Sequence, residues 1–176
     1  MILGEKALRE LYPGLDDNQY QPAGIDLKLG NIKFFYNKEE VYGIVNGVKQ
    51  LPEQEDVKEN VVKLGSTKLE VGFMLEPHKP YIGVVKNKVK IPLDILQLYY
   101  PRSSLLRAGV DVRTAVGDPG FDGHLSFLII NHNDKPFFIK KDERFAQMVC
   151  MRLDGATNGY DGDYNDCSGQ SRDKLL

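Results

Sequence analysis

Apolar and polar residues alternate along several short segments of the chain, with glycine and proline between them. Three segments, residues 25–29, 68–71 and 88–91, show this alternation, which is typical of strands that bury one face. Two further segments, residues 125–130 and 145–153, are almost continuously apolar, which predicts strands buried on both faces. The pattern therefore indicates a protein built mainly from β-strands.

Helical spacing of apolar residues occurs at the start of the chain. Residues 3–11 place apolar side chains three or four positions apart, and a Tyr-Pro-Gly sequence ends the pattern. A second helical turn is predicted over Ser103 to Arg107, where Ser103 or Ser104 can cap its start. Many short strands with one or two short helices favour an all-β fold, a closed or nearly closed barrel.

The chain has 176 residues, which fits one domain with a core of its own. We expect that domain to cover residues 1–154. Residues 51–60 are predicted to form a charged loop. Residues 155–176 are rich in Gly, Asp, Asn and Ser, so they are predicted to form a flexible tail.

Composition excludes some classes of function. The net charge is −2, whereas proteins that hold nucleic acid polymers through their phosphates usually carry a basic surplus. The two cysteines, Cys150 and Cys167, do not make a disulfide framework, and Cys150 is expected to be a small buried hydrophobe. Neither a signal peptide nor a membrane span is predicted, so we expect a cytoplasmic protein.

Polar residues interrupt the apolar pattern in four segments. In residues 21–27, small residues lead into a strand that carries Asp26. An exposed carboxylate on an edge strand is the ordinary interpretation of Asp26. In residues 101–107, Arg102 and Arg107 flank two serines. This arrangement suits phosphate binding, although a helix cap with surface arginines gives the same sequence.

The third segment, residues 117–124, holds three glycines and a proline. These residues predict a tight hairpin whose backbone approaches a ligand closely, with Asp118 at its start and Phe121 at its tip. An ordinary hairpin with an Asx turn is the alternative. In the fourth segment, residues 143–148, Gln147 interrupts an apolar strand and needs a hydrogen-bond partner if it is buried.

In this order, the four segments resemble the superfamily that joins dUTP diphosphatases (dUTPases) with dCTP deaminases. The resemblance runs from about residue 21 to residue 170. The residues of its motifs are most similar to those of archaeal dUTPases of the deaminase-like branch. It implies a distorted β-barrel, the β-clip of the dUTPase-like fold. It also implies a homotrimer with sites at the subunit interfaces, and a C-terminal tail that closes over the active site.

One position separates the two activities of that superfamily. Its deaminases carry a proton-shuttling glutamate ten residues after the motif aspartate, and here that position is Leu128. An aliphatic side chain transfers no proton, and positioned proton transfer is worth about 10²–10⁴ in rate. The His-x-Glu and Pro-Cys-x-x-Cys pattern of zinc deaminases is also absent from the sequence. We therefore expect a dUTPase, with a dCTP deaminase or a bifunctional enzyme as the alternative.

The resemblance also implies roles for individual residues. Asp118 would activate the water that attacks the α-phosphorus of dUTP, and Arg102 and Ser103 would act on the phosphate chain beside it. The implied substrate-binding residues are Asp26, Ser104, Arg107, Gly120, Phe121, Gln147, Tyr160 and Gln170. Phe121 would pack on the deoxyribose.

The chemistry implies Mg²⁺, which usually keeps several waters and binds substrate phosphates. We therefore expect no direct protein ligand to the metal, with Asp26 in its second shell. Arg107 is shared with deaminases, in which the equivalent arginine lies in the base pocket. A nucleotide-binding relative without enzymatic activity is the third hypothesis.

Overall fold

The computed structural model describes residues 1–36, 43–45, 48–50, 53–64, 68–162 and 164–165. Its helices are α1 (Glu5–Leu11), the short 3-10 helix η1 (Asp17–Gln19) and α2 (Ser103–Arg107). Its strands are β1 (Tyr20–Gln21), β2 (Gly24–Tyr36), β3 (Gly43–Val45), β4 (Val48–Gln50), β5 (Glu53–Asp56), β6 (Asn60–Leu64), β7 (Lys68–Leu75), β8 (Pro80–Val85), β9 (Val89–Lys90), β10 (Ile95–Pro101), β11 (Val110–Arg113), β12 (Asp122–Gly123), β13 (Ser126–Asn131), β14 (Phe137–Lys140) and β15 (Arg144–Arg152).

The main sheet curls into a nearly closed barrel. Its antiparallel strands follow the order β10-β15-β2-β8-β13-β11, and β1 and β5 pair with the long strand β2. The first and last strands of this order, β10 and β11, come together through the segment that follows β11. There the Thr114 hydroxyl donates to the carbonyl of Tyr99 at 2.7 Å, and Gly117 pairs with Gln97 on β10. Full closure removes sheet edges that would otherwise pair with other chains.

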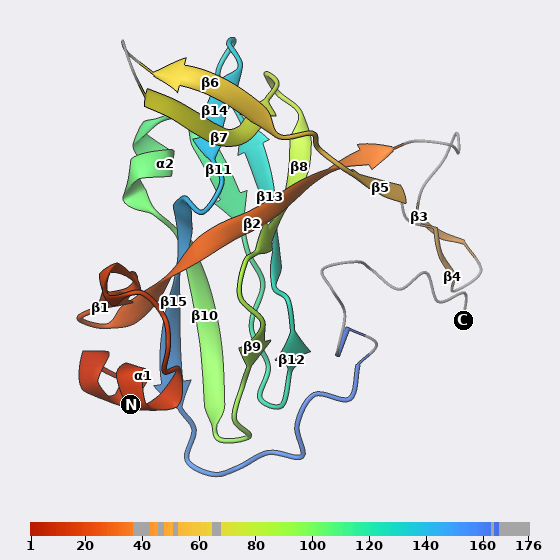
Figure 1. Ribbon diagram of the computed structural model, residues 1–176. Coiled ribbons are helices and arrows are strands. Elements are labelled where there is room, and N and C mark those ends of the chain that lie inside the picture. The colour runs from red at the N-terminus through yellow and green to blue at the C-terminus, as the bar shows by residue number, and fades with distance from the viewer. Residues whose placement is uncertain (37–42, 46–47, 51–52, 65–67, 163, 166–176) are drawn as a thin grey trace.

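Smaller elements cover the ends of the barrel (Figure 1). The sheet β14-β7-β6 lies across the upper end, and α1 lies beside the lower ends of β15 and β10. The β9–β12 pair also lies toward the lower end, whereas α2 follows the upper end of β10. No helix among the described residues is long and apolar enough to cross a membrane.

The core fills the barrel with inward-facing apolar side chains, among them Ile25, Leu29, Ile129, Phe145 and Cys150. The predicted burial of Cys150 is confirmed, since it is fully buried and not in a disulfide. Its counterpart Cys167 lies outside the described residues.

The prediction that β13 and β15 are buried on both faces is wrong. Burial alternates along both strands, and the outward-facing residues of each are partly exposed. On β15 these outward residues include Val149 and Met151, and on the paired strand β10 they include Leu96 and Leu98. Apolar side chains therefore occupy an outer face of the barrel as well as its core.

Local predictions differ from the structure in three places. The first helix begins at Glu5 rather than at residue 3, because the backbone of Leu3 pairs instead with Cys150. Part of the predicted loop 51–60 forms β5 and the start of β6, and β5 pairs with β2. Neither predicted serine caps α2, since its N-cap residue is Arg102 and makes no side-chain cap bond.

Candidate active site

Asp26 lies in the middle of the main sheet, and its carboxylate is buried between two arginines. Its Oδ2 atom is 3.3 Å from Nε of Arg102 and 3.3 Å from Nη1 of Arg144, and its side chain is 3% exposed. Burial raises the pKa of the Asp26 carboxyl, and the two guanidinium groups oppose that rise. An exposed carboxylate on an edge strand is therefore excluded. Asp26 instead holds two guanidinium groups in place.

The predicted phosphate-binding segment gathers at the start of α2. The backbone N–H of Arg102 donates to the carbonyl of Phe145, which continues the ladder between β10 and β15 to the first turn of α2. Ser103 is exposed, and its hydroxyl accepts a hydrogen bond from Nη2 of Arg107 at 3.2 Å. Ser104 and Arg107 are also exposed. The structure therefore brings the predicted phosphate donors together at the surface.

Gln147 belongs to the same outer face of the sheet. It pairs with Asp26 on β2 and with Tyr100 on β10, and directly paired residues place their side chains on the same side. Its side chain is partly exposed, so it is not an amide of the core. A Cβ atom at Gly24 would lie 2.6 Å from the carbonyl of Met148 and 3.1 Å from Cγ of Gln147. A larger residue at Gly24 would therefore displace Gln147.

Asp118 lies in a loop of residues 117–123 that closes one side of the barrel. The N–H of Phe121 donates to the carbonyl of Asp118 at 3.2 Å, and Gly120 has a φ of 84°, which favours glycine. The two arms of this 117–123 loop do not form the predicted hairpin with each other. Gly117 pairs with β10, whereas residues 122–123 pair with β9. The side chain of Asp118 is exposed, and so it can reach a water molecule.

The chain after β15 returns to the 117–123 loop. The N–H of Tyr160 donates to the carbonyl of Pro119 at 2.7 Å, and the Tyr160 ring meets the Phe121 ring edge-on, with centroids 5.8 Å apart. Asn165 joins the same contact, because its side chain accepts from the N–H of Asp122 and donates to the carbonyl of Tyr160. Gln170 lies outside the described residues.

The structure does not bring Asp118 and Arg102 together within one chain. Gly117 pairs with Gln97 in antiparallel fashion, so Asp118 lies level with Leu96, six residues before Arg102. At about 3.3 Å per residue, this separation along β10 is roughly 20 Å. Figure 1 shows α2 at the upper end of β10 and the β9–β12 pair toward the lower end. The predicted site residues therefore form two groups. One is the 117–123 loop, and the other is a phosphate-binding group of residues around Asp26 and Arg102.

A buried polar cluster behind the 117–123 loop was missed by the sequence interpretation. Gln97 is fully buried; its Nε2 donates to the Tyr12 hydroxyl at 2.6 Å, and the Tyr99 hydroxyl donates to its Oε1 at 2.5 Å. The buried Cys150 thiol lies in the same cluster. The signal in the sequence is a glutamine at an inward position of the apolar run 95–99.

This cluster predicts a loss of stability at alkaline pH. Burial raises the pKa of Cys150 to about 11, and burial also raises the pKa values of Tyr12 and Tyr99. Above the ordinary pKa values of 9.0 for cysteine and 10.0 for tyrosine, the folded protein binds more protons than the unfolded chain. The free energy of unfolding should therefore fall as pH rises, by about 1.4 kcal/mol per group and pH unit.

Urea unfolding at about pH 8 and about pH 10.5 measures this effect. The Tyr99→Phe variant removes one of the three groups, so its stability should decline less steeply between the two pH values. An equal decline in both proteins would contradict the assignment to this cluster.

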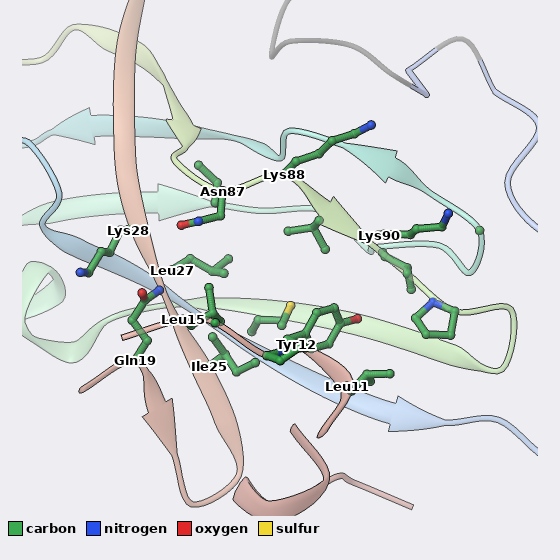
Figure 2. A pocket seen from close by; sticks show the side chains of 18 of the residues that line it. Leu11, Tyr12, Leu15, Gln19, Ile25, Leu27, Lys28, Asn87, Lys88 and Lys90 are labelled. Carbon is green, nitrogen blue, oxygen red and sulfur yellow. The ribbon is translucent and has the colours of Figure 1, made fainter. Parts of the chain in front are cut away.

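A cavity of about 750 Å³ lies between the segment after α1 and the segment that carries β9. Figure 2 shows Tyr12 and Ile25 within it, with Lys28 on one side and Lys88 and Lys90 on the other. Of the predicted site residues that the structure describes, only Gly120 lines it. This cavity is therefore separate from the phosphate-binding group of residues around Asp26 and Arg102.

Leu128 lies on the partly exposed face of β13. It pairs with Arg113 on β11 and with Ile82 on β8, and Ser126 lies on the same face two residues away. Neither paired neighbour is a carboxylate that could replace a glutamate. Asp111 lies diagonally across on the same face, and its carboxylate is paired with Nε of Arg113 at 2.9 Å.

The described residues contain no group of three His, Cys, Asp or Glu side chains that could hold a metal ion. Asp118 is an exposed carboxylate and Asp26 is already paired with two arginines. Mg²⁺ commonly uses one or two carboxylates together with substrate phosphates. This donor set fits a magnesium ion that is carried by the phosphate chain of a ligand.

Comparison with known proteins gives a consistent set of relatives. Residues 4–153 match the model of the dCTP deaminase-like family. The probable deoxyuridine 5'-triphosphate nucleotidohydrolase of Methanopyrus kandleri is 44% identical over 165 residues, which cover 93% of this chain and 99% of that protein. The deoxyuridine 5'-triphosphate nucleotidohydrolase of Methanocaldococcus jannaschii is 34% identical, over 93% of this chain and 98% of its own length.

Deaminases appear among the relatives as well. The dCTP deaminase of Pyrococcus horikoshii is 30% identical and covers 93% of this chain and 91% of its own length. Among solved structures, the 2'-deoxycytidine 5'-triphosphate deaminase of Agrobacterium tumefaciens superposes with a TM-score of 0.61 at 21% identity. That match covers 85% of this chain and 46% of the other chain, and it shows that the two share a fold.

Proposed function

The chain belongs to the dCTP deaminase-like family, and we propose that it is a dUTP diphosphatase, a hydrolase that converts dUTP to dUMP and pyrophosphate. One observation carries the choice of activity. Leu128 stands where deaminases of this superfamily carry their glutamate, and its paired neighbours are Arg113 and Ile82. The relatives named as deoxyuridine triphosphate nucleotidohydrolases support the same choice.

The reaction begins with water held at Asp118. The exposed carboxylate accepts a proton from this water as the water attacks the α-phosphorus. The 117–123 loop binds the base and sugar, with the ring of Phe121 packed on the deoxyribose. Gly120 is needed in this loop, since its φ of 84° suits glycine and a Cβ atom there would lie 2.9 Å from Cα of Gly159.

The phosphate chain is bound by the group around Arg102. The Arg102 guanidinium, oriented by the buried Asp26, contacts phosphate oxygens together with Ser103, Ser104 and Gln147. Ser103, which accepts a hydrogen bond from Arg107, contacts the leaving pyrophosphate. Charge-assisted bonds of this type grow stronger as charge develops in the transition state.

Mg²⁺ bound to the substrate neutralises charge on the phosphate oxygens. Asp26 influences that region only indirectly, because its carboxylate is buried beneath Arg102 and Arg144. The tail that carries Tyr160 and Gln170 completes the closure of the site over the triphosphate.

Two separated groups of residues require a second copy of the chain, and we propose a homotrimer with sites between subunits. The two groups lie roughly 20 Å apart along β10, beyond the reach of one arginine side chain. The outer face that carries Gln147 continues into apolar residues, namely Leu96, Leu98, Val149 and Met151. Partly exposed apolar residues side by side on an outer face favour a protein interface. Light scattering that gave the mass of one chain would contradict the trimer.

The decisive experiment offers dUTP and dCTP to the same purified protein, with Mg²⁺ and with EDTA. We expect pyrophosphate and dUMP from dUTP in Mg²⁺, much less product in EDTA, and no ammonia from dCTP. Ammonia release would establish the deaminase or the bifunctional alternative. Binding of dUTP without either product would indicate a nucleotide-binding protein. We also propose a cytoplasmic location, where the buried thiol of Cys150 would stay reduced.

A further inference from the structure

The peptide that carries Asp118 rests on two inward-facing polar side chains of β10. The N–H of Gly117 donates to the carbonyl of Gln97 at 2.8 Å, and the N–H of Gln97 donates back at 3.0 Å. A Cβ atom at Gly117 would lie 2.2 Å from the Tyr99 hydroxyl oxygen and 3.0 Å from Cβ of Gln97. The Tyr99 hydroxyl therefore occupies the space directly beneath the residue before Asp118.

The Tyr99 hydroxyl is itself held in a single direction. It donates to Oε1 of Gln97 at 2.5 Å, and Nε2 of Gln97 donates to the Tyr12 hydroxyl at 2.6 Å. Because an amide has one donor end and one acceptor end, these two bonds fix the orientation of Gln97. Gln97 is fully buried and Tyr99 is 5% exposed. In such surroundings a satisfied polar network favours one arrangement strongly.

An apolar residue at position 97 would fill the barrel without needing partners. The Tyr99 hydroxyl, at the end of this polar chain, instead packs against Gly117, one residue before the carboxylate to which the proposed reaction assigns the water. No hydrogen bond of this chain reaches the Asp118 carboxylate itself, among those that the structure describes. The contact with Asp118 therefore runs through the backbone of Gly117. Burial raises the pKa of Tyr99, and the nearby charge of Asp118 adds to that rise.

We propose that Tyr99 and Gln97, held by Tyr12, are positioning residues for Asp118. They set the tilt of the peptide between Gly117 and Asp118, and with it the direction from which the carboxylate meets the attacking water. The inference rests on the proposed function, in which Asp118 activates that water. A misplacement of about 1 Å at a reacting group costs on the order of 10² in rate.

The Tyr99→Phe variant removes one hydroxyl and leaves the ring in place. We expect kcat for dUTP to fall by about tenfold, with a smaller rise in KM, because the 117–123 loop also binds the base and sugar while the contacts of Arg102 with the phosphate chain are kept. Tyr81→Phe is the matched control. Its hydroxyl is also buried and also makes a hydrogen bond, here accepting from the N–H of Glu76 at 3.0 Å. The control should keep wild-type kcat.

A double variant separates positioning from general stability. Gly117→Ala drives a methyl group into the Tyr99 hydroxyl and should lower kcat strongly. Adding Tyr99→Phe removes the nearest atom and leaves the ring carbon Cζ at 2.9 Å, so the double variant should recover part of the activity that Gly117→Ala alone loses. If each substitution only loosened the fold, the two losses would multiply instead.

Amide hydrogen exchange of residues 117–123 supplies a readout that does not depend on activity. Exchange should be faster in Tyr99→Phe than in the wild type and unchanged in Tyr81→Phe. The positioning role is wrong if Tyr99→Phe behaves as Tyr81→Phe does, or if its loss appears mainly in KM or only in proportion to a lower Tm. If the wild type does not hydrolyse dUTP, the proposed function fails first, and the positioning role fails with it.

Discussion

Replacement of Asp118 by asparagine is expected to lower kcat for dUTP by about 10³-fold or more, while dUTP still binds. Asparagine has nearly the same shape as aspartate, so the turn at residues 118–121 and its hydrogen bonds are kept. Its amide accepts no proton from water at neutral pH. Pyrophosphate release measures kcat, and calorimetry with a non-hydrolysable dUTP analogue measures the dissociation constant.

Asp122 provides the matched control for Asp118. It lies in the same loop, and its carboxylate is paired with Nζ of Lys88 at 2.8 Å. Asp122→Asn should therefore retain most of the wild-type kcat. Near-normal activity of Asp118→Asn would show that another group activates the water. Equal losses in both variants would show that the loop tolerates no change of charge.

Replacement of Arg102 by alanine should lower kcat/KM by about 10²–10³-fold, because a charge-assisted contact to the phosphate chain is lost. Arg144→Ala is the comparison that isolates this contact. Both guanidinium groups lie 3.3 Å from the same oxygen of Asp26, and the two side chains are 28% and 30% exposed. The two variants should lose similar stability, since each leaves Asp26 with one partner, but Arg144→Ala should lose much less activity. Equal losses of activity would assign Arg102 a purely structural role.

Mixing the two inactive variants tests whether a site contains residues of two chains. Chains with Asp118→Asn keep a normal Arg102, and chains with Arg102→Ala keep a normal Asp118. The two variants are unfolded, mixed in equal amounts and refolded together. If each site takes Asp118 from one chain and Arg102 from another, random assortment should leave both residues intact in about a quarter of the sites. Activity should then reappear in the mixture. A mixture as inactive as its components would place both residues in one chain.

The strand content and the barrel follow from the alternation of residues, because the period of two is set by local geometry. The burial of β13 and β15 was misjudged for a physical reason. Apolar residues on the outer face of a sheet look in sequence like residues that face the core, as Val149 and Met151 illustrate. A continuous apolar run does not show which of its side chains turn outward, because that depends on how the strand is placed in the sheet.

The candidate site was predicted in part. Asp118 and Arg102 lie in recognisable sequence segments. Arg144 contacts Asp26 only because β15 pairs with β2, and the local periodicity of the sequence does not predict the order of strands in a sheet. The partners of Gln97 arise in the same way, since Tyr12 comes from the other end of the sequence. Contacts between distant segments depend on the topology of the sheet, and those were the contacts missed.

The buried thiol of Cys150 also bears on how the enzyme tolerates oxidants. Peroxides react with thiolates, and a thiol with a pKa of about 11 is almost entirely protonated at neutral pH. Because Cys150 is fully enclosed by the barrel, an oxidant also lacks a path to the sulfur. The polar side chains behind the 117–123 loop are thus packed against a sulfur atom that resists conversion to a sulfenic acid, and this part of the molecule should keep its shape under oxidative stress.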